Sequence, residues 1–554
     1  MINCFIKFKF KFKYNFITII LLFAIYLTFF PNLAFSQVQL HVDIEDSIYT
    51  ILDICSIKGA IQKLSYVKPY SKSKIIELIN ECIRNSNRLS NFERRYLLKT
   101  LINYKTKEFE RRKIKISENS EFRMLIVNSP VIHSFNMLKI QFIGDLHKNI
   151  SYDFNIGFLF DKIDPNAFVP YDFTKRWDGF HLWFDKRQFS DGINNHFNLA
   201  WNTYPELAYI STNKKIKLEL ARYRHEWGNG IGSLNLSSTA RPINAFEGYF
   251  WLSSNLKLSF LTGILGNWAK EKAEYTEQKM FSTHQIEYFP FDWLYITFGE
   301  NVVWPNRLDL LYLNPFMFYY LGQNIIGDID NLSYHGSFML TFSPYVRFYF
   351  NYFIDELENE SLNVFFQYPQ NQYAWQTGIK LPIPFLPFSL FTLQYTKIEP
   401  YCYTHYPQEV SDFTKPVNIN YTNDGENIGY HLPPNSDEFL LKIFSCINYE
   451  LSAEIQYQLI RHGSGNHEDG QIEGDINIWL DYGNMDKYPA KNFLHDGVYE
   501  YINALKLKLY YNFPLSETKI WIEYNYFKAR NYKNVLGNYK SNNIIGIGCQ
   551  LIIK

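Results

Sequence analysis

The sequence predicts a mainly β protein, a transmembrane outer-membrane β-barrel of about sixteen to eighteen antiparallel strands with a small N-terminal α-helical domain. Three observations lead to this prediction. The chain opens with a secretory leader, most of it consists of segments in which apolar and polar residues alternate, and long polar connections alternate with short ones. The 43 Tyr, 48 Phe and 11 Trp fit the aromatic girdles of a membrane barrel, although a compositional bias of the genome would produce the same abundance.

The first 36 residues have the three parts of a signal peptide. Four lysines between positions 7 and 13 form a positive region, residues 17–30 form an apolar core, and Ala34 and Ser36 are the small residues of a cleavage site. We expect cleavage near Ser36/Gln37 and export to the cell outer membrane. The apolar core is about 14 residues long, shorter than the ~20 of a membrane-spanning helix, so a retained N-terminal anchor is the weaker alternative.

A helical period of 3.6 marks the region after the leader. Apolar residues within 48–55 share one helical face, and Gly59 is placed to end that helix. Ser71 is a suitable N-cap for a second helix, and Ser90 and Glu93 have the capping-box spacing at the start of a third, which we expect to continue to Lys113. The predicted domains are a signal peptide at 1–36, a helical domain at 37–116 and the barrel at 117–554.

From about residue 122 the period changes to 2. Residues 150–160, 450–459 and 505–513 each place apolar side chains on one face and polar or charged side chains on the other. Segments with the same rhythm lie near 138–148, 180–188, 254–262, 284–299, 336–353, 375–381, 388–397, 438–447, 472–480, 518–527 and 543–553. Segments of about 8–11 residues are long enough to cross a bilayer as tilted strands. Their number exceeds the ~7–9 strands of one soluble sandwich, which favours the barrel.

Long connections rich in Asn, Gly, Pro, Asp and Tyr separate many of these segments. They lie at 162–178, 264–280, 301–333, 398–437, 460–471 and 481–499. Because membrane barrels carry long loops outside and short turns inside, we expect these connections to be external loops, where recognition would take place.

One connection carries a sequence motif. Arg222 opens the pattern R-x-x-x-E-W-G-N-G, and L-N-L-S-S-x-A-R-P follows from Leu234. This stretch resembles the signature segment of the Wzi capsule-assembly family of outer-membrane β-barrels. Further elements similar to that family lie at 313–316, 327–331, 345–356, 393–400 and 429–437, with Pro433 in place of a glycine. The resemblance implies a helical domain at the periplasmic mouth and a non-enzymatic, lectin-like protein that holds capsular or other surface polysaccharide.

Residues suited to binding a polysaccharide, or to lining the lumen, cluster around this motif. Aromatic faces stack under sugar C–H groups, while amide, carboxylate and guanidinium groups hydrogen-bond sugar hydroxyls. The candidates are Arg222, Arg224, Glu226, Trp227, Asn229, Arg241, Tyr249, Trp251 and Trp304. Each aromatic residue could instead be a girdle or packing residue, and each arginine could pair with a strand carboxylate in the lumen.

Other classes of function have weaker support. The formal net charge of zero disfavours a nucleic-acid partner, which would need a basic face. His462, His467, Glu468 and Asp469 lie in loop sequence without a frame for a metal, and no G-x-S-x-G serine is present. We therefore predict no catalytic residue, metal or cofactor, and a monomer whose partners are polysaccharide and outer-membrane lipid. A porin on the same barrel is the alternative.

Overall fold

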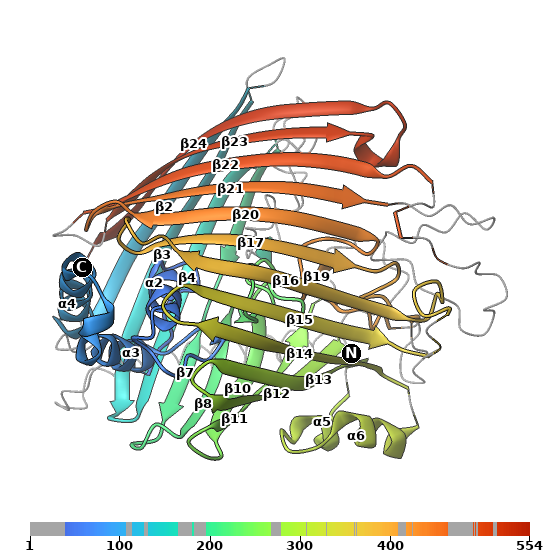
Figure 1. The fold of residues 1–554 in the computed structure, drawn as a ribbon, viewed down its shortest axis with the longest axis horizontal. Coiled ribbons are helices and arrows are strands. Elements are labelled where there is room, and N and C mark those ends of the chain that lie inside the picture. Colours follow the sequence, from blue (N-terminus) through green and yellow to red (C-terminus); the bar gives the residue numbers. More distant parts are fainter. Residues whose placement is uncertain are drawn as a thin grey trace, which may run out of the picture.

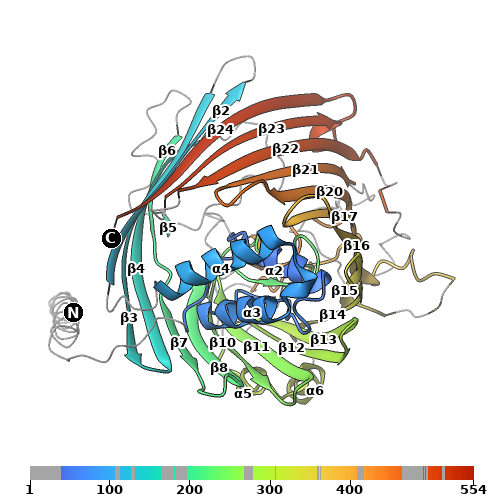
Figure 2. The same ribbon diagram turned by 60° about the vertical axis from the view of Figure 1, so that its left-hand side comes forward.

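The computed structural model is a closed antiparallel β-barrel with helices at one mouth (Figures 1 and 2). It describes residues 39–106, 113–126, 131–163, 180–181, 196–266, 279–305, 307–327, 329–358, 361, 363–407, 417–423, 425–463, 491, 493–494, 497–513 and 518–553. The leader and the segment expected near 472–480 fall outside these residues, and of the segment expected at 180–188 only β5 (Phe180–His181) is described.

The wall follows the chain order and closes where the last strand pairs with the first. Its strands are β2 (Lys113–Ile126), β3 (Val131–His147), β4 (Ile150–Ile163), β6 (His196–Asn202), β7 (Glu206–Ile210), β8 (Ile216–Tyr223), β10 (Ile243–Trp251), β11 (Leu256–Leu265), β12 (Lys279–Phe291), β13 (Leu294–Pro305), β14 (Asn331–Phe342), β15 (Val346–Glu356), β16 (Gln372–Pro382), β17 (Ser389–Ile398), β20 (Ser436–Cys446), β21 (Leu451–His462), β22 (Glu500–Asn512), β23 (Lys519–Arg530) and β24 (Tyr539–Ile553). Because β6 and β7 pair with different halves of β4, they share one position, and the barrel has eighteen. The predicted fold class is confirmed.

Three boundaries differ from the prediction. Residues 284–299 and 336–353 each contain two strands, because the tight turns at 292–293 and 343–345 interrupt what reads as one alternating run. The wall starts at Lys113, where a helix was expected, because the Lys-Ile-Lys-Ile sequence alternates with period 2 and pairs with β3.

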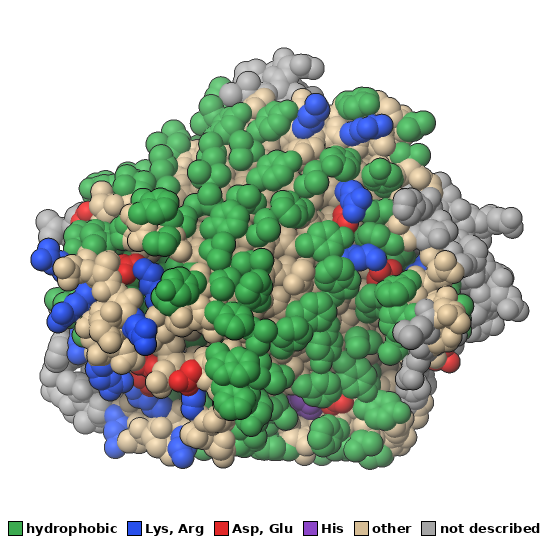
Figure 3. All heavy atoms as spheres, viewed as in Figure 1, with side chains coloured by type: hydrophobic (Ala, Val, Ile, Leu, Met, Phe, Trp, Pro, Cys, Tyr) green, Lys and Arg blue, Asp and Glu red, His purple; other side chains and the backbone are tan. Residues whose placement is uncertain are grey.

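Alternation sorts the side chains of each strand between lumen and outer face. On β15, Arg347, Tyr349 and Phe353 are buried inside, whereas the intervening Phe348 is 40% exposed on the outside. Figure 3 shows hydrophobic side chains spread over the outer face of the strands, while Lys and Arg side chains gather at the end where the helices lie. An apolar outer band is what a bilayer requires of a barrel wall.

The helical cap, which we define as residues 39–106, contains α2 (Ile48–Ile57), β1 (Val67–Lys68), α3 (Lys72–Arg84), a 3₁₀ turn (Ser86–Arg88) and α4 (Asn91–Thr106). The helix boundaries follow the sequence signals. Gly59 has a φ of 79° just beyond α2, and Ser71 Oγ accepts from Lys74 N at 3.3 Å. Ser90 N donates to Glu93 Oε2 at 2.9 Å while Glu93 N donates to Ser90 Oγ at 3.2 Å, which is a complete capping box.

A buried ion cluster fixes the cap to the wall. Asp53 of α2 contacts the guanidinium of Arg347 on β15, accepts from Lys380 Nζ of β16 at 2.7 Å and accepts from the Tyr66 hydroxyl at 2.7 Å. Burial alone would raise the pKa of Asp53, but Lys380 and Arg347 together outweigh burial and hold that pKa well below its usual range. The cap is therefore locked to the wall by charge as well as by apolar packing.

The opposite half of the lumen contains what we call the inner plug, the described residues of 224–242 and 399–435. Its apolar side chains form one core with inward residues of the wall. That core includes Trp227, Leu234, Leu236, Tyr403, Tyr421, Tyr430 and Leu432 of the plug and Phe281, Phe353, Ile398, Ile460, Ile502, Phe527 and Ile544 of the wall. The prediction that 398–437 is an external loop is wrong for the described part, because its apolar residues fold inward and asparagine side chains satisfy its backbone.

A helical hairpin packs on the outer face of the wall. It consists of α5 (Leu310–Leu313) and α6 (Tyr319–Ile326), and Figure 1 shows it outside the barrel beside β12 and β13. Tyr319 N donates to Glu300 Oε2 at 2.7 Å, and the Tyr319 ring lies 4.3 Å from the ring of His284. The hairpin thus covers outward polar residues that would otherwise meet lipid.

Among the described helices, none combines the length and the apolar character needed to cross a membrane.

Candidate functional site

A pocket lies between the helical cap and the wall formed by β8, β10 and β11. Its volume is ≈ 640 Å³ when the space at its mouth is counted. It is lined by Leu64, Ser65, Val67, Lys68, Pro69, Tyr70, Ser71, Lys74, Leu78, Lys217, Trp227, Glu247, Gly248, Tyr249, Trp251, Lys257, Ser259 and Phe260. Three of the aromatic residues proposed from the sequence, Trp227, Tyr249 and Trp251, therefore share one pocket.

The local fold explains why these three rings meet. Tyr249 and Trp251 stand two residues apart on β10, so both point inward. Trp227 belongs to β9 (Glu226–Trp227), which pairs with β1 of the cap and brings Trp227 opposite Val67. Gly228 N continues this pairing by donating to Tyr66 O at 3.1 Å. The pocket thus exists only because the motif segment, the cap and the wall come together.

Lysines give the pocket its electrostatic character. Lys257 Nζ lies 2.6 Å from Glu287 Oε1, donates to Ser65 Oγ at 2.9 Å and stands 4.9 Å from the centre of the Tyr249 ring. Lys68 Nζ lies 5.6 Å from the centre of the Tyr66 ring. The pocket thus offers aromatic faces beside ammonium groups, of which Lys257 is already paired with Glu287. Sequence reasoning missed these lysines, although Lys217 and Lys257 occupy inward positions of alternating strands.

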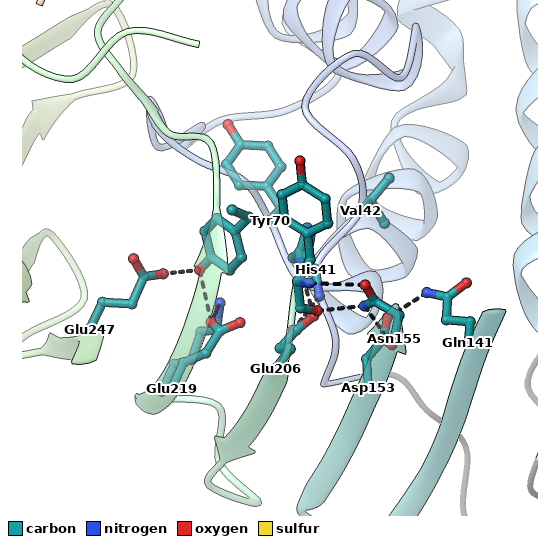
Figure 4. Close-up of polar contacts among 12 residues, drawn as sticks. His41, Val42, Tyr70, Gln141, Asp153, Asn155, Glu206, Glu219 and Glu247 are labelled. Atoms are coloured by element: carbon teal, nitrogen blue, oxygen red, sulfur yellow. Dashed lines mark hydrogen bonds and ion pairs between the residues drawn. The ribbon is translucent and has the colours of Figure 1, made fainter. Parts of the chain in front are cut away.

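Behind the pocket, a row of buried ionisable groups runs across β10, β8 and β7 toward the cap (Figure 4). Glu247 contacts the Tyr223 hydroxyl and His225 Nε2, and Tyr223 also donates to Glu219 Oε2 at 3.1 Å. The row ends at Glu206, which accepts from the backbone N–H of His41 at 2.8 Å. His41 itself lies in the cap, so this row joins cap and wall a second time.

A smaller cavity, of ≈ 290 Å³ when the open space beside it is counted, lies deeper in the lumen. Asn229 is part of its lining and donates from Nδ2 to Ser337 Oγ at 3.1 Å. Trp227 lines this cavity as well as the pocket, so the indole separates the two spaces. With Asn229 almost fully buried, the cavity suits water better than a saccharide.

The other polar residues of the motif are dispersed. Arg222 lies on the outward face of β8, as Leu220 does, and its guanidinium is 5.1 Å from the centre of the Tyr204 ring. Arg224 contacts Glu45 of the cap at 3.4 Å. Glu226 accepts from Ser238 N at 2.8 Å inside the plug, where burial raises its pKa. These three contact protein groups rather than the pocket.

Arg241 and Trp304 lie elsewhere again. Arg241 pairs with Glu426 at 3.2 Å, and both side chains are about one quarter exposed, at 23% and 24%. This pair belongs to the inner plug on the side away from the cap. Trp304 faces outward on β13 and is fully buried beneath the α5–α6 hairpin, where its Nε1 donates to Arg307 O at 3.1 Å. It packs the hairpin and does not face the lumen.

The fold has a counterpart among solved structures. Wzi of Escherichia coli, described as an outer-membrane protein involved in group 1 capsule assembly and as a carbohydrate-binding β-barrel, is 12% identical with a TM-score of 0.59, and the likeness covers 93% of this chain and 99% of Wzi. The likeness is one of fold. OprD of Pseudomonas aeruginosa is 9% identical with a TM-score of 0.41 over 80% of this chain and 95% of OprD. No family model matches the sequence, and no curated protein does.

Proposed function

We propose that this chain is a non-enzymatic outer-membrane protein that holds capsular or other surface polysaccharide and supports capsule assembly. The observation that supports this most is the filled lumen. A single apolar core joins the inner plug to inward residues of eleven wall strands, β10 to β13, β15 to β17 and β21 to β24. A second apolar core joins the cap to the wall at the opposite mouth of the barrel. A barrel packed in this way is suited to holding a ligand rather than to passing solutes. The carbohydrate binding in the published description of Wzi adds weight to a sugar ligand.

The orientation that fits this role follows from the connections. The turns between β3 and β4, β12 and β13, and β14 and β15 are short and lie at the cap end, whereas most connections at the other end, the one between β2 and β3 excepted, are long. Barrels in outer membranes keep short turns in the periplasm and long loops outside. The cap would then be periplasmic, and the pocket of Trp227, Tyr249 and Trp251 would lie in the periplasmic half of the barrel. Arg241 would lie toward the cell surface.

A channel is the alternative, and one observation favours it. Along β3, β4 and β22, the inward residues Lys139, Asp153 and Lys506 are only half-buried. These strands also line the half of the lumen that contains the cap. Among the described residues, the apolar core of the plug has no member from β3 or β4. Water could therefore follow a polar strip on that side of the barrel.

Two measurements on the purified, refolded protein separate the proposals. If the chain holds polysaccharide, it should give no steady large conductance in planar bilayers, with or without surface polysaccharide from the source organism. In detergent, the same protein retains labelled polysaccharide. Steady large conductance that the polysaccharide leaves unchanged, together with no retention of polysaccharide, would overturn the polysaccharide-holding proposal and establish a channel.

Variants then locate the binding site. Trp251→Ala and Tyr249→Ala remove ring faces from the pocket, and Arg241→Ala tests the opposite end. Trp293→Ala is the matched control, since Trp293 lies in the β12–β13 turn with 48% of its surface exposed and lines neither cavity. Retention that falls at least tenfold for the pocket variants alone would place the saccharide at the cap end.

A further inference from the structure

Three metal-ligating side chains meet where the start of the cap crosses the barrel wall. His41 lies ahead of α2, Glu206 begins β7 and Glu219 lies on β8. His41 Nδ1 is 2.6 Å from Glu206 Oε2, and one nitrogen of the imidazole and one oxygen of each carboxylate all lie within 4.8 Å of one another. Figure 4 shows these side chains converging from three separate elements. Their separation in the chain hides them from any spacing motif, which is why the sequence predicted no metal.

Glu219 is held so that one of its oxygens remains available. Its Oε2 contacts the Lys217 ammonium and accepts from the Tyr223 hydroxyl at 3.1 Å. Its Oε1 has no hydrogen-bond partner, although Glu219 is only 1% exposed. A carboxylate oxygen buried without a donor is unfavourable, and this one belongs to the same carboxylate that faces Glu206 and His41.

The charges around this point call for a cation. Glu206, Glu219 and Glu247 are all buried carboxylates, and Lys217 is the lysine that pairs with this row. Carboxylates thus outnumber the one lysine of this row, and a cation bound here would meet carboxylate oxygens on the wall side and an imidazole on the cap side.

We propose that His41, Glu206 and Glu219 bind one divalent transition-metal ion of the Zn²⁺ class. One imidazole nitrogen with two carboxylate oxygens is a donor set that such ions accept, with a fourth position for water. An imidazole and so few oxygens disfavour Ca²⁺ and Mg²⁺, which prefer six or more oxygen ligands. None of the three ligands lines the pocket proposed for the polysaccharide, so the two proposals are tested separately.

The ion would be structural and would cross-link the cap to the wall. His41 belongs to the cap and the two glutamates belong to the wall, so coordination ties the start of the cap to β7 and β8. The ligands are already oriented, because Glu206 Oε1 accepts from His41 N at 2.8 Å and the His41 ring lies 4.3 Å from the Tyr223 ring. Groups that orient metal ligands in this way raise metal affinity.

The test is a titration of the metal-stripped full chain in detergent with Zn²⁺, followed by calorimetry. We expect one ion per chain, a higher unfolding temperature by linkage and slower proteolysis around residues 39–45. Co²⁺ in place of Zn²⁺ reports the geometry by its visible absorption. Glu219→Gln weakens binding at least tenfold and His41→Ala abolishes the Co²⁺ spectrum. Since Glu219→Gln keeps size and shape, it covers the case in which His41→Ala does not fold.

His147→Ala is the matched control, because His147 ends β3 at the same mouth and is exposed. Its binding should equal that of the unchanged chain. Absence of Zn²⁺ binding, or binding that survives both Glu219→Gln and His41→Ala, would overturn the proposal. Binding lost only with His147→Ala would identify an adventitious surface site and would equally overturn it.

Discussion

The helical cap and the inner plug fill the same lumen by different means. The cap is anchored through charges that lie at single points, with Asp53 between Arg347 and Lys380 and Glu93 accepting from Phe388 N of the wall at 3.1 Å. The plug is held by its apolar core and by many contacts spread along its length, a few of them to buried wall charges such as Lys279 and Asp355. A neutral example is Gln394 of β17, which accepts from Ile231 N at 2.8 Å and donates to Ile231 O at 3.0 Å, as a neighbouring strand would.

The difference predicts how each part can be released. A buried charge that loses its partner is strongly destabilising, so one substitution can free the cap. A neutral network loses one or two contacts per substitution, and the remainder of the apolar core still holds the plug. The cap is thus the part that can respond as a unit, whereas the plug behaves as part of the wall.

The largest effect is expected from Asp53→Ala. The change leaves Arg347 and Lys380 buried without their carboxylate, which costs about 3–5 kcal/mol of cap docking. Hydrogen exchange across 39–106 should rise sharply while the amides of the plug stay protected. Equal exposure of cap and plug would show that the two are one cooperative unit. The triple variant Asp53→Leu, Arg347→Met, Lys380→Met removes all three charges and should recover most of the loss.

Low pH should loosen the same contact. The pKa of Asp53 in the folded protein lies well below its ordinary value because Lys380 and Arg347 outweigh burial. The stabilisation is therefore fully present above about pH 4 and declines as the pH falls below that value. The protection of the cap amides, corrected for the intrinsic slowing of exchange in acid, should fall between pH 6 and pH 3. Asp53→Asn should lack this component, so an identical acid response in both proteins would contradict the assignment.

Gln394→Ala tests the neutral network of the plug. It removes both hydrogen bonds to Ile231 and the one that Gln394 Oε1 accepts from the Tyr349 hydroxyl at 2.8 Å. Each buried group left without a partner costs about 1–3 kcal/mol, so urea unfolding should shift by at least about 2 kcal/mol. Gln141→Ala is the matched control on β3, where the amide donates to half-buried Asp153, and should shift it by less than about 1 kcal/mol.

Gly230→Ala should cost somewhat less. A Cβ at Gly230 would lie 2.0 Å from Gln376 Oε1 and 2.7 Å from Gln394 Oε1, so these side chains must turn away and lose hydrogen bonds, or the plug must shift, at a cost of about 1–3 kcal/mol. Gly322→Ala is the control in α6, because its nearest atom would be at 3.6 Å and alanine favours a helix by up to about 1 kcal/mol. Urea unfolding should show opposite signs for the two variants.

The sequence predicts the parts that depend on local periodicity and capping. Alternation located the wall, and Ser71, Ser90 and Glu93 marked helix starts that the structure has. It could not show that 399–435 turns inward, because Tyr and Asn are as common in external loops as in a packed interior. Nor could it separate Trp251, which lines the pocket, from Trp304, which lies under the hairpin. Both stand on alternating strands, and their surroundings are set by segments distant in the chain.

The smallest effect on stability is expected from Arg241→Ala. Arg241 and Glu426 form a partly exposed pair, and such pairs contribute about 0–1 kcal/mol. The unfolding midpoint in urea should therefore stay within about 1 kcal/mol of the unchanged chain. This near-neutrality makes the variant informative, because a fall in polysaccharide retention could not be attributed to a loosened plug. Retention equal to that of the unchanged chain would remove the far mouth as the binding site and leave the pocket at the cap.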